Sequence, residues 1–291
     1  IIDEKDNMLF NRYERHYSEV LDTVKKLVEE AYSTIGKNNV SAMITGSGGV
    51  SLSEAVDIPF IQEVVATANA IEKVIPKTNV AIELGGEDAK IIYFEGGNVE
   101  ERMNGICAGG TGSFIDQMAS LLQTDAEGLN ELAKKHNIIY PIASRCGVFA
   151  KTDIQPLINE GAAREDLAAS IFQAVVNQTI SGLACGKPIR GNVAFLGGPL
   201  HFLSELRERF IETLGLNEET ALMPENSHLF AAFGSAISAD TTKVSDFETL
   251  IAHLGKKNIL SAEIARLEPL FHNKEEYDEF TKRHEKASVP K

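Results

Sequence analysis

The 291-residue sequence contains no tryptophan and only three cysteines. Three cysteines cannot form the disulfide framework of a small secreted domain, so we expect the thiols to be ligands or buried packing in the reducing cytoplasm. An apolar run of about 18 residues is also lacking, which predicts that no helix spans a membrane. Positive charge is scarce as well: the formal net charge of −14 makes nucleic acid and anionic membranes poor partners.

The apolar patterns that are present alternate between strand and helix, as in an α/β protein. Continuous or alternating apolar runs predict strands, and apolar residues three and four apart predict helices. The predicted strands, with their turns, are 40–49, 79–86, 89–103 as a hairpin with Gly96-Gly97 at its tip, and 192–199. The predicted helices cover 18–35, 60–75, 111–122, 126–136, 154–160, 164–183 and 202–214, and a further one starts near 227.

Three of the predicted strands end in glycine pairs, which are Gly48-Gly49, Gly85-Gly86 and Gly197-Gly198. Glycine lets a ligand approach the backbone closely and lets N–H groups point at phosphates. Three such pairs suggest loops that converge on one ligand. The alternative is that strands in an α/β protein simply connect through glycine turns.

The stretch IELGGEDAK carries the clearest nucleotide signal. Its glycine amides could line a phosphate, and Glu87 or Asp88 could hold Mg²⁺ through water or orient an attacking water. Lys90 follows as a candidate cofactor-binding cation. A polar hairpin turn with solvated charges is the alternative. Neither a Walker A motif nor a GxGxxG fingerprint is present, which argues against a P-loop protein and a dinucleotide site.

The stretch NGICAGGTGSF places Cys107 directly before a glycine-rich helix start. The backbone amides of Gly109, Gly110, Thr111 and Gly112 would form an anion site at the N-terminus of that helix. The same N–H dipoles would favour a thiolate at the cysteine. This arrangement predicts a thiol beside a nucleotide loop.

Cys146 lies in a second loop, ASRCGVFAKTDI, and neither it nor Cys107 belongs to a CxxC pair. Zinc and a [4Fe–4S] cluster both need four ligands, so two cysteines are half a set that a two-fold dimer could complete. Two packing cysteines are the alternative. We expect Cys185 to be a small buried residue at a helix end, and Glu63 to face either a cleft or solvent.

The motifs IELGGEDAK, NGICAGGTGSF, SRCGVFAKTDI and AFLGGP, in this order, resemble those of the activator ATPases of 2-hydroxyacyl-CoA dehydratases and the related ATPase subunits of benzoyl-CoA reductase. The resemblance covers roughly residues 1 to 240. It implies the two-lobed α/β fold of actin, Hsp70 and sugar kinases (ribonuclease H-like), with the N-terminal strand and first phosphate loop missing. It also implies an ATP-dependent activator that passes a low-potential electron to a CoA-ester dehydratase or reductase.

The resemblance assigns roles to individual residues. Cys107 and Cys146 would hold half of a [4Fe–4S] cluster that bridges a homodimer, or a pseudo-dimer with a second activator module. Gly85, Gly86, Glu87 and Asp88 would form the second phosphate loop around ATP or ADP and Mg²⁺, with Glu87 and Asp88 as catalytic residues. Gly109, Gly110 and Gly112 would face the phosphates, and Gly197 and Gly198 the adenosine. A ferredoxin or flavodoxin would be the electron donor.

The sequence departs from the family pattern at several points. Residue 1 falls where the first strand should end, so we expect a fragment, and GLACGKPIRGNVAFLGGP is more like members with two activator modules in one chain. Glu87 stands where Gln is usual, and Glu83 where Asp is common. The expected division is lobe I at 1–78 with part of 225–243 packed on it, lobe II with the cysteine loops at 79–224, and a helical tail or linker at 244–291.

Two other functions stay open at this point. One is an N-acetylhexosamine or related sugar kinase of the same superfold, which could recruit Asp88 but would give the cysteine loops no purpose. The other is a regulatory module that binds nucleotide without turnover. Phosphoryl transfer to a sugar would favour the first, and ADP binding without hydrolysis the second.

Overall fold

The computed structural model describes residues 1–104, 109–143, 146–255, 268–285 and 287. Its strands are β1 (Asn39–Val40), β2 (Val80–Leu84), β3 (Ala89–Glu95), β4 (Asn98–Asn104), β5 (Val193–Leu196), β6 (Ala221–Leu222) and β7 (Ser245–Asp246). Its α-helices are α1 (Val20–Ile35), α2 (Gly49–Val56), α3 (Glu63–Val74), α4 (Gly112–Leu121), α5 (Ala126–Ala133), α6 (Gly147–Asn159), α7 (Arg164–Thr179), α8 (Gly198–Phe202), α9 (Ser204–Leu214), α10 (Phe230–Ile237), α11 (Phe247–Leu254) and α12 (Lys274–Glu285). A π-helical turn η1 (Ile180–Ala184) extends α7, and a 3₁₀ turn η2 (Ser227–Leu229) precedes α10.

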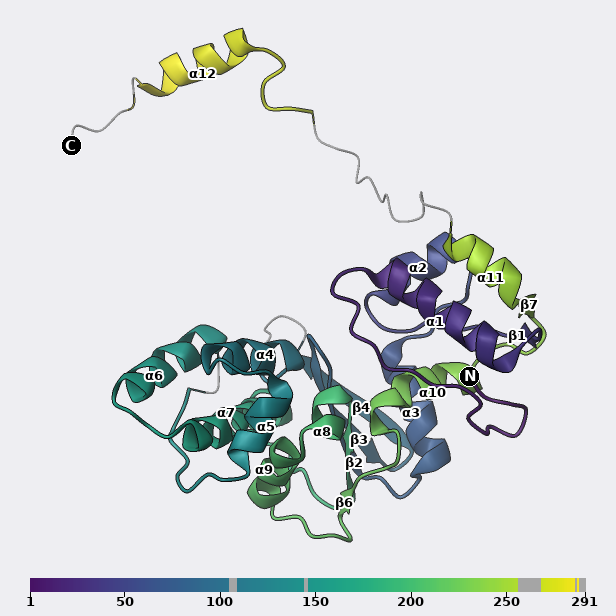
Figure 1. The fold of residues 1–291 in the computed structure, drawn as a ribbon, viewed down its shortest axis with the longest axis horizontal. Helices are drawn as coiled ribbons and strands as arrows, with labels where there is room; N and C mark the ends of the chain where they lie inside the picture. The colour runs from purple at the N-terminus through teal and green to yellow at the C-terminus, as the bar shows by residue number, and fades with distance from the viewer. Residues whose placement is uncertain (105–108, 144–145, 256–267, 286, 288–291) are drawn as a thin grey trace.

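A five-stranded sheet with the order β4-β3-β2-β5-β6 organises the molecule (Figure 1). The pairs β2–β3 and β3–β4 are antiparallel, whereas β2–β5 and β5–β6 are parallel. The parallel pairing brings the C-terminal ends of β2 and β5 side by side, with Glu83 opposite Leu196. The glycine pairs that follow these two strands therefore emerge at the same edge of the sheet.

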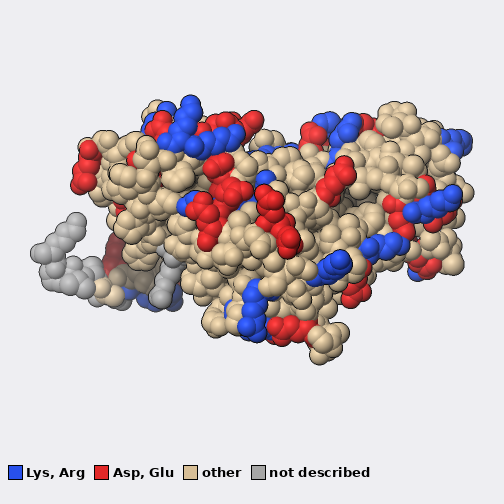
Figure 2. All heavy atoms as spheres, turned by 90° about the horizontal axis from the view of Figure 1, so that it is seen from below, with Lys and Arg blue, Asp and Glu red and all other residues tan. Residues whose placement is uncertain are grey.

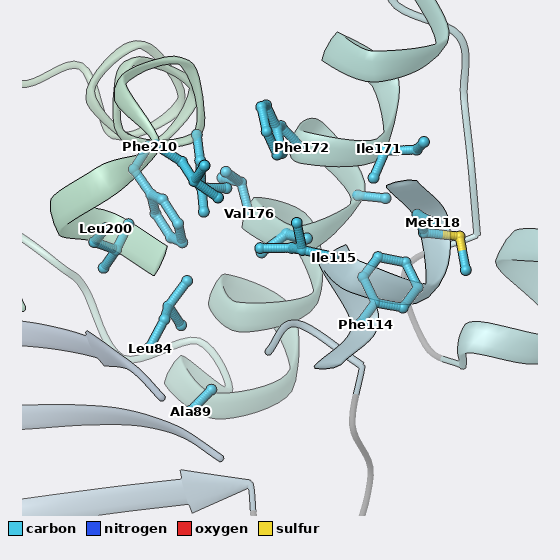
Figure 3. Close-up of a cluster of buried hydrophobic side chains, with 14 of the residues drawn as sticks. Leu84, Ala89, Phe114, Ile115, Met118, Ile171, Phe172, Val176, Leu200 and Phe210 are labelled. Atoms are coloured by element: carbon cyan, nitrogen blue, oxygen red, sulfur yellow. The ribbon is translucent and has the colours of Figure 1, made fainter. Parts of the chain in front are cut away.

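The two faces of the sheet are covered by different helices. Alternate residues of a strand point to opposite faces. Val80, Ile82 and Leu84 accordingly join a large core with α4, α5, α6, α7 and α9, and Ala81 joins a smaller one with α3 and α10. Figure 3 shows part of the large core, in which Leu84 and Ala89 of the sheet lie opposite residues of α4, α7, α8 and α9. Burying each large apolar side chain contributes about 1.5–3 kcal/mol.

A smaller lobe is built from segments that are far apart in the sequence. Leu52 and Val56 of α2 pack with Leu254 of α11, and partly buried residues of α1 complete this cluster. The strands β1 and β7 pair antiparallel and fix α11 beside α1. The helix α12 has no buried residue and lies apart from both lobes in Figure 1.

Most of the predicted elements are confirmed, including the glycine-tipped hairpin of β3 and β4. The predicted strand at 40–49 was wrong: only Asn39–Val40 and a single bridge between Ile44 and Phe60 have strand pairing. The Gly48-Gly49 pair opens α2 instead of ending a strand. The helix α6 begins at Gly147, several residues before the predicted start.

The stretch Arg164–Ala184 corrects the expectation that no run has the length and hydropathy of a membrane span. Its mean hydropathy is 1.2, and 67% of the window is buried within the structure. Most of this helix is buried in the large core, which explains its apolar composition, and exposed polar residues such as Asn177 and Ser181 lie on its remaining face. Length and composition alone do not separate such a core helix from a membrane span.

The contacts bear on the expected division into lobes. The helix α3, inside 1–78, packs against the sheet together with α10, inside 225–243. A Cβ on Gly234 would overlap the carbonyl oxygen of Ala66, so these two helices cross in direct backbone contact. The helix α11, inside the expected tail 244–291, belongs to the smaller lobe.

Candidate functional site

A cleft of about 1650 Å³ separates the smaller lobe from the sheet. One wall comes from the segment 13–18, α1, α2 and the loop 45–49, and the other from the ends of β2 and β5 and the start of α4. Seven predicted site residues line it: Gly85, Gly86, Glu87, Asp88, Lys90, Gly112 and Gly198. Three of the glycine-containing loops singled out in the sequence therefore converge on one space, as the sequence predicted.

The loop after β2 is packed directly against the start of α4. The Gly112 amide donates to the Gly85 carbonyl at 2.9 Å, and the Ser113 amide donates to the Gly86 carbonyl at 2.7 Å. A Cβ on Gly112 would lie 3.2 Å from that Gly85 oxygen and 3.4 Å from Pro199. These two helix-terminal amides are thus used within the protein, which the sequence reading of free amides at this terminus did not foresee.

The remaining residues of the predicted phosphate loops lie elsewhere. Gly109 lines a separate cavity of about 160 Å³ with Asn104 and Gln178. Gly110 has φ +84° and packs on Gln178, and Thr111 is fully buried. Among the described residues that line the main cleft, neither Gly110 nor Thr111 appears. Their phosphate-facing role stays a prediction.

The glycines after β5 have packing reasons of their own. Gly197 has φ +87°, and a Cβ there would overlap the backbone of Leu84. A Cβ on Gly198 would overlap the hydroxyl of Tyr13. Gly197 is thus required by the backbone itself, whereas a side chain at Gly198 would displace only the Tyr13 ring. The predicted contact of both glycines with adenosine stays a prediction.

Lys90 is the centre of a buried ion cluster. Its side chain is 2% exposed, and its Nζ lies 2.8 Å from Glu63 and 2.9 Å from Asp88. A third carboxylate, that of Glu83, lies 4.0 Å from the same nitrogen. The helix α3 supplies Glu63 and Thr67, whose hydroxyl donates to Glu83 at 3.4 Å. Residues 63, 88 and 90 of this cluster face the cleft.

Burial and charge compete within this cluster. Burial raises the pKa of Glu83 to about 7, against the opposing pull of Lys90. Burial alone would lower the pKa of Lys90, but the surrounding carboxylates outweigh it and raise that pKa above its usual value. Burial also raises the pKa of Glu101, which lines the cleft nearby. We infer a fixed ammonium among carboxylates, one of which titrates near neutral pH.

The cysteines are only partly described. Cys107 lies outside the described residues. Cys146 is half-buried at the N-cap of α6, and it is not among the described residues that line the main cleft. The expectation for Cys185 was wrong: it is exposed, because the chain leaves η1 through a left-handed residue at φ 46° that turns this side chain outward.

Sequence reasoning missed several cleft residues. The sequence did not show whether Glu63 faces the cleft or solvent. The packing of α3 on β3 directs its side chain to Lys90 and the cleft. Arg15 donates to Asp116 of α4 at 2.7 and 3.2 Å and ties the N-terminal segment across the cleft. Tyr13 and Phe202 also line the cleft, and their ring centroids are 5.6 Å apart. No local motif marks these pairs, since each joins segments distant in sequence.

Comparison with known proteins identifies the family of this chain. The family model of the BadF/BadG/BcrA/BcrD ATPase family matches residues 8–228. The chain belongs to that family. Among its relatives, the 2-hydroxyisocaproyl-CoA dehydratase activator of Clostridioides difficile is 29% identical over 77% of this chain and 84% of its own length. The (R)-2-hydroxyglutaryl-CoA dehydratase activating ATPase of Acidaminococcus fermentans is 30% identical, over 77% and 82%.

Solved structures of family members have the same fold. The activator of the 2-hydroxyisocaproyl-CoA dehydratase from Clostridium difficile, solved with bound ADPNP, superposes with a TM-score of 0.66 at 26% identity, over 77% of this chain and 81% of that one. The dehydratase component A of Acidaminococcus fermentans gives a TM-score of 0.65, over 79% and 83%. The two-lobed ATPase fold predicted from the sequence is confirmed.

Proposed function

We propose that this chain is a reductive activator, in which ATP hydrolysis in the cleft is coupled to electron delivery from a subunit-bridging [4Fe–4S] cluster. The acceptor would be a 2-hydroxyacyl-CoA dehydratase or a related CoA-ester reductase, and a ferredoxin or flavodoxin would be the donor. The observation that carries the ATPase part is the convergence of the loops at Gly85, Gly112 and Gly198 on one cleft beside Lys90.

The nucleotide would be ATP or ADP, by analogy with the relative solved with ADPNP. Gly85 and Gly86 would contact the phosphates, because both line the cleft and a Cβ on Gly86 would meet no atom within 4 Å. Glu87 and Asp88 follow on the same turn, at the cleft wall. There they would orient the attacking water, with Lys90 holding Asp88 in place.

The carboxylates alone do not form a magnesium site. Among the described residues, no three acidic, histidine or cysteine side chains are arranged to hold a metal. Glu63 and Asp88 instead surround an ammonium at 2.8 and 2.9 Å. Mg²⁺ would therefore enter with the nucleotide phosphates, which supply the oxygen ligands that this ion prefers.

Of the two proposed cluster ligands, the described residues include one, Cys146. Cys146 is half-buried at the N-cap of α6, directly before the first helical turn. One chain supplies two thiols from the motif loops at most, so a second copy or a second activator module would supply the other pair. The bound cluster would supply one-electron chemistry at low potential.

Metal analysis of anaerobically purified protein tests the proposal. The wild-type chain should be brown and bind about four iron and four sulfide per dimer, with an EPR signal on reduction. Cys146→Ser and Cys107→Ser should each lose most of this iron. Cys185→Ser is the matched control, since its thiol is exposed and outside the motif loops, and it should keep the iron content. Unchanged iron in Cys146→Ser would refute the cluster assignment.

The sugar-kinase alternative makes the opposite prediction for the same variants. Phosphoryl transfer to a hexosamine, retained when both motif cysteines are replaced, would support it and leave the loop around Cys146 unexplained.

On the face that Figure 2 displays, Lys and Arg side chains are interspersed with Asp and Glu. That distribution agrees with an acidic protein whose partners are a nucleotide and other proteins.

A further inference from the structure

Four rings gather at the wall of the cleft, next to Gly198. This aromatic cluster consists of Tyr13, His201, Phe202 and His228. The rings of Tyr13 and Phe202 are 5.6 Å apart, and that of His228 lies 5.3 and 5.2 Å from them. The His201 ring packs on His228 at 3.9 Å, and its Nδ1 lies 2.8 Å from the Ser227 hydroxyl. The two imidazoles thus back the two carbocyclic rings.

Of these four residues, the two with carbocyclic rings line the cleft, and their rings are tilted by 47° to each other. Tyr13 and Phe202 line it and are 49% and 57% exposed, although aromatic rings gain free energy when buried. Two half-exposed aromatic rings at this tilt can contact a flat ligand, which would stack on one ring and meet the other at an angle.

The position of both rings is fixed by the fold. Phe202 ends the short helix α8, which begins at Gly198. Tyr13 is held two residues before Arg15, whose guanidinium makes two hydrogen bonds to Asp116 at the other side of the cleft. The Tyr13 hydroxyl rests on Gly198, where any Cβ would overlap it. The rings therefore lie beside Gly198, whose neighbour Pro199 packs near Gly112, one of the glycines proposed to face the phosphates.

We propose that Tyr13 and Phe202 form the stacking surface for the nucleobase of a purine nucleoside di- or triphosphate. Because Gly198 has no side chain, the Tyr13 ring can lie against it and take its place in this surface. This inference rests on the proposed nucleotide-binding function. Stacking is tolerant of base identity because every base has a π face, so this surface sets affinity for a base without choosing adenine over guanine.

Calorimetry on the full chain separates the base from the phosphates. Phe202→Ala should weaken ADP and GDP binding by about 10- to 100-fold, the range that alanine substitution of a stacking residue gives, and should leave pyrophosphate binding unchanged. Phe202→Trp should restore ADP affinity. Tyr277→Ala is the control, because that ring is 53% exposed and lies on the remote helix α12.

A second measurement does not depend on the alanine variant being folded. Tyr13→Trp introduces the only tryptophan of the chain. The fluorescence of this variant should change on ADP addition and not on pyrophosphate addition. If the wild type binds ADP but neither the affinity of Phe202→Ala nor the fluorescence of Tyr13→Trp responds selectively, the stacking surface is wrong while nucleotide binding stands. If the wild type does not bind ADP, both proposals are overturned.

Discussion

Replacing Lys90 by methionine should destabilise the protein more than any single change at its surface. Methionine keeps most of the length and volume of the lysine stem and removes only the ammonium. That ammonium is the nearest positive charge to Glu63 and Asp88, at 2.8 and 2.9 Å, and lies 4.0 Å from Glu83. The variant would thus leave three carboxylates around an apolar side chain.

The expected magnitude follows from the cost of an uncompensated buried charge. Removing one partner of a buried ion pair costs about 3–5 kcal/mol. The side chains of Lys90 and Glu83 are 2% and 8% exposed, so solvent screens this pair little. For a domain of this size, each kcal/mol lowers the melting temperature by about 2–4 °C. We expect a decrease of roughly 6–20 °C at neutral pH.

Thermal unfolding followed by circular dichroism measures this decrease. Lys134→Met is the matched control, because Lys134 pairs with Glu131 on the surface of α5, where its side chain is 44% exposed. Such surface pairs contribute at most about 1 kcal/mol. The control should therefore melt within a few degrees of the wild type.

The pH dependence separates charge from packing. Without Lys90, the pKa of Glu83 should rise further, since Lys90 is the neighbour that lowers it. The carboxylates would then take up protons in mild acid, and the destabilisation should shrink as the pH falls from 8 to about 5. A Lys90→Met variant that melts like the wild type, or a deficit independent of pH, would refute the reasoning.

Three further predictions concern single positions. Because burial raises the folded-state pKa of Glu83 to about 7 from 4.5, stability should fall as the pH rises through that window, and Glu83→Gln should flatten this fall by up to about 3 kcal/mol in denaturant titrations. Gly234→Ala should cost more than about 3 kcal/mol in the same titrations, since its Cβ would overlap the backbone of α3, whereas Gly48→Ala, with no atom within 4 Å, should cost little. Burial lowers the pKa values of His201 and His228, so the free energy of unfolding should decrease as the pH falls below about 6.5. If the double variant His201→Gln/His228→Gln keeps the same loss of stability in acid, the two histidines are not its cause.

Local patterns in the sequence determined much of the fold. The apolar spacing of α1, α3 and α7 and the glycine-tipped hairpin at Gly96-Gly97 follow from periodicity and turn chemistry, which involve residues a few positions apart. The order of the glycine motifs was enough to indicate the family. Three glycine pairs, each after an apolar run, also suggested loops that converge on one ligand, and the parallel pairing of β2 and β5 is what brings two of them to the same edge of the sheet.

The tertiary structure alone decided which side chains meet in the cleft. Glu63 reaches Lys90 only because α3 packs on the face of the sheet to which residue 90 points, and Tyr13 reaches Phe202 only because the N-terminal segment packs against the start of α8. Likewise, the first amides of α4 looked free for phosphate but are used by Gly85 and Gly86. Periodicity shows which face of an element is buried, but the partner across the interface depends on sheet order and helix packing, which no local pattern contains.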